Sequence, residues 1–371
     1  LVLEDNRLQT LALSIAEHDG ASALPSLIRL VENFESTGKL DRAVEGIASN
    51  DELLRRANDG KGLTRPELAV IMATAKLTLQ AAIEGCGLGE DGAALPYLIQ
   101  AFPPAMQEKH RAAIEGHRLR DEIIATKLAN RIVNRMGLIH PFELAEEEGC
   151  TLDDVAEAFV IAEQLFDIEA LWEAIDTAEM TEATRITLYE QVAVEMRAHM
   201  ADILRNAVAK RSNDKAVEAY RPTIDALTKA IGVLMPDEIR RQTEGFGDRL
   251  MQAGAPKRIV DRLVRLAQLD GAIGLSALSD KAGVDAVALT RAFTALGAAL
   301  GLDWAQGTAM QLDPSDPWER LLTAGLARDY QAMRLDFLSR SGKKDPEAAV
   351  AKWLYVNAAR VTAFRTMIDN A

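Results

Sequence analysis

The stretch GKGLTRPELAVIMATAK, residues 60–76, combines two glycines, a lysine and the start of a long apolar run. Glycines and a lysine before a helix can cradle a phosphate, because backbone N–H groups and the ammonium converge on it. The phosphate-binding motif requires Gly-x-x-x-x-Gly-Lys-Ser/Thr after a strand. Here Lys61 lies between the glycines and no strand is predicted before them, so the pattern does not favour a phosphate site.

Thr64 and Glu67 have the spacing of a capping box, in which the N-cap side chain and the carboxylate three residues later bind each other's backbone N–H groups. Pro66 falls in the first turn, where a missing N–H costs nothing. Leu63 and Leu68 have the spacing of a hydrophobic staple. The stretch therefore predicts a well-capped helix start rather than a catalytic loop.

Other residues that could do chemistry lack the partners that they would need. His110 and His117 could share a helix face, but Ala113 and Ile114 between them supply no third metal ligand. No serine or cysteine has the sequence context of a nucleophile elbow. The loops GCGLGEDG and GFGDRL lack the third glycine and the preceding strand of a dinucleotide-binding fingerprint. We therefore expect no catalytic, cofactor-binding or metal-binding residue in this chain.

Arg120, Lys127 and Arg131 form a basic row, the candidate contact site of the sequence, because they follow one another at +7 and +4 in a predicted helix. Two alternatives stay open. Such a row is commonly a solvated helix face. It could instead dock on an acidic surface or an anionic ligand, and the stretch from Glu143 to Glu182 holds 14 acidic residues and no Lys or Arg.

The composition is that of an acidic, helix-forming chain. Its 371 residues have a formal net charge of −14, and 48% are hydrophobic but only 5% aromatic. We expect neither nucleic acid nor a membrane as a partner, because nucleic acids and anionic membrane surfaces both bind basic faces. Two distant cysteines, Cys86 and Cys150, indicate a reducing compartment, so we expect a cytoplasmic location.

Apolar residues recur with a helical period, and no stretch alternates for long enough to predict a strand. We therefore predict an all-α fold. Besides the helix that begins after Thr64, the expected helices are residues 7–19, 21–35, 39–46, 117–137, 151–166, 181–206, 214–232, 236–253, 256–269, 275–281, 285–300, 316–341 and 345–369.

A shift of 134 residues overlays residues from about 130–205 on 264–339 without a gap, and Gly149 then falls on Gly283. An overlay of this length, with matching glycine stops, predicts an internal duplication of a helical unit. We expect three parts, which are residues 1–58, 59–210 and 211–371.

Several long motifs resemble the C-terminal region of the large bacterial NAD-specific glutamate dehydrogenases. They are EDNRLQTLALS (4–14), GKLDRAVEGIASNDELLRR (38–56), GKGLTRPELAVIMATAK (60–76), HRLRDEIIATKLANRIVNRMG (117–137), ALGLDW (299–304) and DPWERLLTAGLARDY (316–330). These motifs stand in the family's order and span nearly the whole chain. The resemblance implies a helical accessory region for assembly and regulation, in an enzyme that oxidatively deaminates L-glutamate to 2-oxoglutarate and ammonia.

The resemblance also implies that residues 1–58 join this region to an upstream catalytic part, which is then the first expected partner. Further copies in a homo-oligomer are the second. NAD would bind to the full-length parent and not to this fragment, which we expect to be inactive alone. Two other functions stay open, a free-standing helical scaffold that binds proteins and a small-ligand regulatory module.

Overall fold

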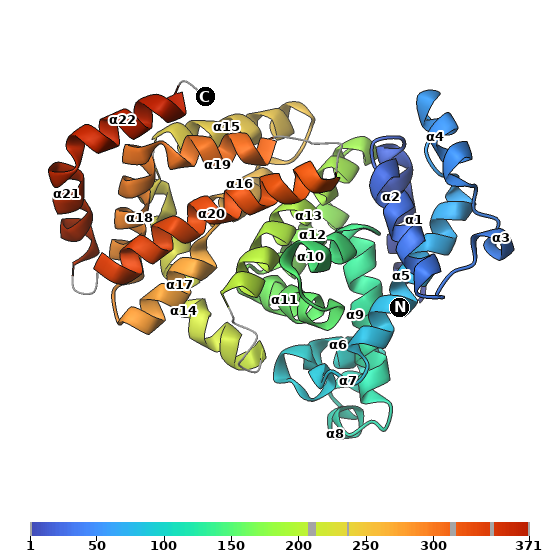
Figure 1. The fold of residues 1–371 in the computed structure, drawn as a ribbon. Helices are drawn as coiled ribbons and strands as arrows, with labels where there is room; N and C mark the ends of the chain where they lie inside the picture. Colours follow the sequence, from blue (N-terminus) through green and yellow to red (C-terminus); the bar gives the residue numbers. More distant parts are fainter. Residues whose placement is uncertain (1, 207–212, 236, 312–316, 342–344, 370–371) are drawn as a thin grey trace. The chain divides into compact units, whose positions relative to one another are not determined.

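The computed structural model describes residues 2–206, 213–235, 237–311, 317–341 and 345–369 (Figure 1). Every regular element in these ranges is an α-helix or a short 3-10 helix, which confirms the predicted all-α fold. Contacts divide the chain into two units, Leu1–Ala216 and Val217–Ala371. The three-part division stays a prediction, and its boundary at residue 210 falls outside the described ranges.

The described residues of the first unit form thirteen α-helices before α14, and α5 lies at its centre, packed against α1, α9 and α11. Among the described helices, α5 alone is long and apolar enough to cross a membrane. Its residues Leu68, Ile71 and Leu79 are buried, as in the core helix of a globular unit. The helices are Val2–Asp19 (α1), Leu24–Ser36 (α2), Arg42–Glu45 (α3), Asn50–Asn58 (α4), Arg65–Ile83 (α5), Leu95–Gln100 (α6), Pro104–Gln107 (α7), Arg111–Glu115 (α8), Arg120–Met136 (α9), His140–Glu148 (α10), Leu152–Leu165 (α11), Ile168–Thr177 (α12) and Glu182–Arg205 (α13), with 3-10 helices at Leu88–Glu90 (η1) and Gly92–Ala94 (η2).

Helix α9 carries the basic row, and its apolar face sets its position. Ile124, Leu128 and Ile132 recur at helical spacing and are fully buried. The helix packs with this face against α5, α11 and α13, and it ends at Gly137, whose φ of 91° few other residues tolerate. The side chains on the flanks of this face therefore point toward neighbouring helices rather than into open water.

The second unit is also helical, and α18 lies in its core between α17, α20 and α21. The predicted single helix over residues 345–369 is wrong, because the chain breaks it at Asn357, whose side chain donates to the carbonyl of Trp353 at 2.9 Å. The helices are Asn213–Leu234 (α14, which spans the division), Asp237–Gln252 (α15), Lys257–Gln268 (α16), Ala272–Ala282 (α17), Ala286–Leu300 (α18), Leu302–Gln311 (α19), Pro317–Ser341 (α20), Pro346–Val356 (α21) and Ala358–Asp369 (α22).

Helices α10 to α13 and α17 to α20 match under the 134-residue shift. Helices α12 and α19 then begin and end at the same positions, and α11 and α18 begin together. Gly149 and Gly283, which end α10 and α17, both have a φ of 63°. Each packed pair of the first set, such as α11 with α13, recurs in the second as α18 with α20. These matches are what the predicted duplication requires, although the duplication itself stays a prediction.

Candidate functional site

Residues 60–76 form the loop before α5 and the capped start of this helix. The carboxylate of Glu67 accepts hydrogen bonds from the Thr64 N–H at 2.7 Å and from the Thr64 hydroxyl at 2.7 Å. It also accepts from the N–H of Ala48 at 3.0 Å and from Arg56 at 2.9 Å. Burial alone would raise the pKa of Glu67, but these donors outweigh it and hold the pKa below its ordinary value. Because its own carboxylate occupies the position of a bound anion, this helix start is a structural cap.

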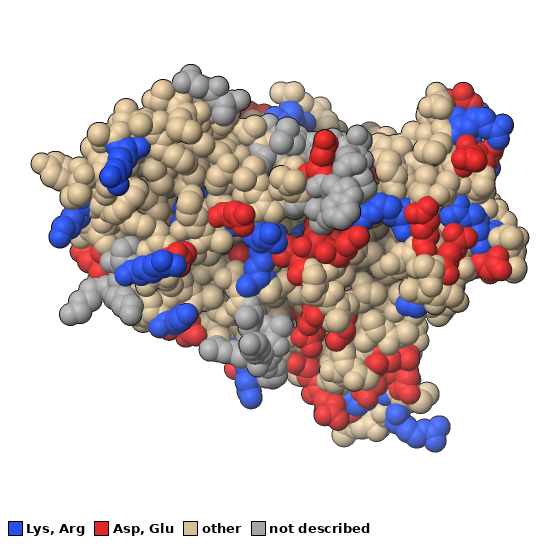
Figure 2. All heavy atoms as spheres, in the orientation of Figure 1, with Lys and Arg blue, Asp and Glu red and all other residues tan. Residues whose placement is uncertain are grey.

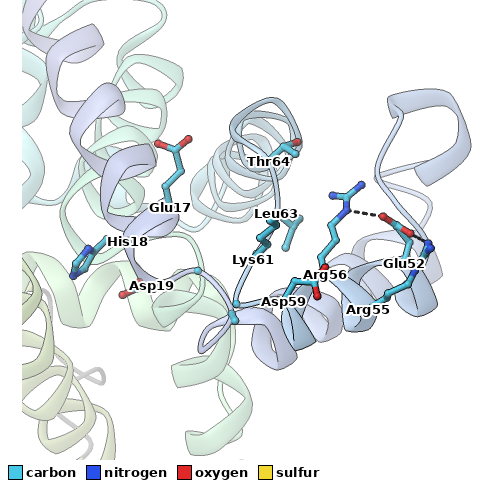
Figure 3. A pocket seen from close by; sticks show the side chains of 14 residues that line it. Glu17, His18, Asp19, Glu52, Arg55, Arg56, Asp59, Lys61, Leu63 and Thr64 are labelled. Carbon is cyan, nitrogen blue, oxygen red and sulfur yellow. Dashed lines mark hydrogen bonds and ion pairs between the residues drawn. The ribbon is translucent and has the colours of Figure 1, made fainter.

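A cavity of about 680 Å³ lies beside this cap, between the end of α1, helix α4 and the loop over residues 60–64 (Figure 3). Its charged side chains are largely paired, since Arg55 and Arg56 both contact Glu52 and Glu17 contacts Arg65. The cavity is therefore polar but nearly balanced in charge. This balance gives no basis for assigning a particular ligand.

The basic row contacts three different parts of the first unit. Arg120 donates to the backbone carbonyls of Gly89 and Glu115. Lys127 Nζ lies 3.3 Å from Asp5 Oδ2 of α1. The remaining member, Arg131, pairs with two carboxylates beyond α9. The row is thus engaged inside this chain, and its docking on another molecule or an anion stays a prediction.

Arg131 binds within the acidic stretch that the sequence singles out. Its Nε lies 2.5 Å from Glu163 Oε1, and its Nη2 lies 3.4 Å from Glu169 Oε1. The hydroxyl of Tyr97 donates to the same Glu163, which is buried. Burial raises the pKa of Glu163, and burial together with this carboxylate raises the pKa of Tyr97 well above its ordinary value. The proton therefore stays on Tyr97, and Arg131 balances the buried charge.

Arg135, one turn later on α9, belongs to a second cluster that again combines an arginine, a tyrosine and a carboxylate. Its Nη2 lies 2.9 Å from Asp176 Oδ2, while Asp176 Oδ1 accepts from the Tyr189 hydroxyl and from Arg7 at 2.8 Å. Burial alone would raise the pKa of Asp176, but Arg135, Tyr189 and Arg7 hold it below its ordinary value. Burial is also the main cause that raises the pKa of Tyr189 to about 12. The guanidinium carbon of Arg135 lies 5.0 Å from the ring centre of Trp172.

Arginines of other helices pair with the acidic residues of α10. On the face drawn in Figure 2, acidic side chains gather over the part of the first unit that holds α10 to α12. The pairs that join α10 to its neighbours are Arg29–Glu146, Arg197–Glu143, Arg197–Glu147 and Arg205–Glu148. An acidic block without a basic residue of its own is therefore a docking surface for the arginines of α2, α9 and α13.

These clusters are structural by their geometry. Each buried carboxylate is held by an arginine and a tyrosine, so its oxygen atoms find their partners inside the unit and the cluster stabilises the helix packing. Among the described residues, no group of three or more His, Cys, Asp and Glu side chains is arranged to hold a metal ion. The sequence reasoning missed both clusters, apart from Arg131, because their members lie far apart along the chain.

Known proteins match the chain over its whole length. It is 28% identical over 375 residues to an NAD-specific glutamate dehydrogenase of Pseudomonas aeruginosa. This match covers 99% of the present chain and 23% of that protein. Proteins of the same name from Halomonas elongata and Mycobacterium tuberculosis are 25% and 27% identical, each over 100% of this chain and 23% of their own length. The chain thus spans less than a quarter of these relatives. The family model described as "Glutamate dehydrogenase, C-terminal" matches residues 60–371, and the chain belongs to that family.

Proposed function

We propose that this chain is the helical C-terminal accessory region of an NAD-dependent glutamate dehydrogenase. In the parent polypeptide, L-glutamate, NAD and water give 2-oxoglutarate, ammonia and NADH. The observation that carries the proposal is the match of the whole chain to 23% of each of three enzymes with this name. The catalytic chemistry then belongs to the rest of the polypeptide.

The geometry of the first unit supports an accessory role. Its buried charged groups stabilise contacts between helices, as in the pairs Arg131–Glu163 and Arg135–Asp176. The glycine-rich start of α5 is capped by Glu67. We therefore assign NAD binding to the parent enzyme and none to this fragment, which acts in assembly and regulation of a cytoplasmic homo-oligomer.

The test compares two proteins, the full-length polypeptide and residues 1–371. The full-length protein should produce NADH in a glutamate-dependent manner, and residues 1–371 should neither do so nor bind NADH in a calorimetric titration. Glutamate-dependent NADH production by residues 1–371 would overturn the accessory role. A full-length protein without this activity would favour a helical scaffold or a small-ligand regulatory module instead.

A further inference from the structure

Helix α1 lies in a groove of the first unit that later parts of the chain build. It packs against α5, α9 and α13. Leu8, Leu11 and Ala12 are buried in this groove, and Arg65 donates to the carbonyl of Thr10 at 3.2 Å. One face of α1 is thus apolar and covered, as in a helix that docks on a preformed surface.

Ion pairs hold α1 at both of its ends. Near its start, Asp5 lies 3.3 Å from Lys127 of α9, and Arg7 lies 2.8 Å from Asp176 of α12. Near its end, Glu17 pairs with Arg65 of α5. Three helices of the first unit, α5, α9 and α12, therefore each supply one charged side chain of the sign opposite to that on α1. This alternation fixes the register of α1 along the groove, because a shift by one turn would separate all three pairs.

Asp176 connects α1 to the centre of the unit. Its Oδ1 accepts from Arg7 and from Tyr189 of α13, and its Oδ2 accepts from Arg135 of α9. Arg7 is 49% exposed, whereas the Asp176 side chain is only 14% exposed. If Arg7 departs, Asp176 keeps two donors inside the unit, so the cluster remains intact. The arginine of α1 is thus the replaceable member of a permanent cluster.

The region that the family model matches includes the residues of the groove but not the helix that lies in it. The family model begins at Gly60, so it contains Arg65, Lys127 and Asp176 but not α1. In the relatives, more than three quarters of the polypeptide lies outside the matched segment. Helix α1 therefore belongs to the sequence that precedes the family region, and it is bound by that region.

We infer that the α1 groove is the site where the family region, residues 60–371, binds the preceding part of the polypeptide. The Arg7–Asp176 and Asp5–Lys127 pairs then couple the family region to that preceding part. This inference rests on the proposed function. Regulation then acts through the position of α1, which the Asp176 cluster fixes at one end and Arg65 at the other. The partner is the chain's own residues 2–19 and what precedes them.

The test uses the full-length polypeptide and the charge reversal Arg7→Glu, which places two carboxylates together at Asp176. Arg111→Glu is the matched control, because Arg111 is also 49% exposed and pairs with a carboxylate, Glu115, that lies in its own helix. We expect Arg7→Glu to lower kcat with glutamate at least threefold and Arg7→Lys to restore it. Arg111→Glu should stay within twofold of the wild type, and both proteins should unfold at similar temperatures.

Hydrogen exchange gives a second measurement in the same polypeptide. The amides of α1 should exchange at least tenfold faster in Arg7→Glu than in Arg111→Glu, and the double change Asp5→Lys with Lys127→Asp should restore the protection that Asp5→Lys removes. Equal kinetics and equal exchange in Arg7→Glu and Arg111→Glu would overturn the inference. Absence of glutamate-dependent activity in the wild type would instead refute the proposed function, and α1 exchange would then decide the docking alone.

Discussion

Arg131 and Arg135, one turn apart on α9, both lie against the ring of Trp172, with guanidinium carbons 5.3 and 5.0 Å from its centre. Each arginine also pairs with a carboxylate, Glu163 for the first and Asp176 for the second. Trp172 is 1% exposed, and the side chains of Arg131 and Arg135 are 20% and 6% exposed, so both cations contact the ring largely away from water. The ring and the two ion pairs together connect α9 to α11 and α12.

Removal of Arg131 should be costly, because it takes away the cation that pairs with the buried Glu163, while the Tyr97 hydroxyl still donates to this carboxylate. We expect Arg131→Met to lower the free energy of unfolding by about 3 kcal/mol. The double variant Arg131→Met with Glu163→Gln should lose less, since the uncompensated charge is then gone. Urea unfolding at pH 7 measures both. The control Arg111→Met should change stability by no more than about 0.5 kcal/mol, and an equal loss in Arg131→Met and Arg111→Met would contradict this account.

The capping box of α5 predicts that two substitutions lower the stability of the protein to different degrees. Thr64→Ala should cost about 0.5–2 kcal/mol, as for other N-caps. Glu67→Ala should cost about 3 kcal/mol, because it also leaves the Ala48 N–H and Arg56 without an acceptor. The pKa of Glu67 is lowered in the folded state, so its contribution is present above its ordinary value of 4.5 and is lost as the pH falls below that value. The difference in stability between the wild type and Glu67→Ala should therefore be larger at pH 7 than at pH 3. A constant difference at both pH values would show that charge plays no part.

The sequence alone predicts much of the local structure. The spacing of Thr64 and Glu67 identifies the start of α5, and the structure confirms it because a cap depends on neighbours within one turn. Short helices such as α6, α7 and α12 were missed, since four to ten residues give too little periodicity. The break at Asn357 was missed for a related reason, because one side-chain bond ends α21 without a glycine or proline.

Less of the candidate site could be predicted from the sequence. Tyr97, Glu163 and Arg131 meet from α6, α11 and α9, and no local pattern connects positions 97, 131 and 163. One signal was present, the i,i+4 spacing of Arg131 and Arg135 beside an apolar face, followed by an acidic stretch without a basic residue. Such a stretch indicates that its arginines come from elsewhere in the fold. Which arginine meets which carboxylate depends on helix packing, and the sequence does not show it.

Lys76 should be a destabilising charge. Its ammonium is buried and has no hydrogen-bond partner among the residues that the structure describes. Burial lowers the pKa of Lys76 from 10.5 to about 8, and Asp5 offsets this shift only in part. Below pH 8 both the folded and the unfolded chain are protonated and the cost is fully present. Between pH 8 and 10.5 the unfolded chain binds more protons, so stability rises with pH.

Lys76→Met should therefore raise the free energy of unfolding at pH 7 by ~1 kcal/mol, discounted for partial exposure. The gain should shrink as the pH approaches 10. The control Lys257→Met removes an exposed lysine that pairs with Asp261 in its own helix, and it should change little at either pH. A Lys76→Met gain that is equal at pH 7 and pH 10 would assign the effect to packing instead of charge.

Gly62 should be irreplaceable because the backbone of Gly20 passes beside it. A Cβ atom on Gly62 would lie 2.6 Å from the carbonyl oxygen of Gly20 and 2.8 Å from its carbonyl carbon, and backbone atoms cannot rotate away. We expect Gly62→Ala to lower the free energy of unfolding by about 1–3 kcal/mol, because the end of α1 must move away from the loop before α5. Gly232→Ala is the control. A Cβ there meets nothing within 4 Å inside α14, and it should gain about 0.5–1 kcal/mol. Thermal unfolding of both variants checks the pair, and a Gly62→Ala protein as stable as the wild type would show that α1 does not need this close approach.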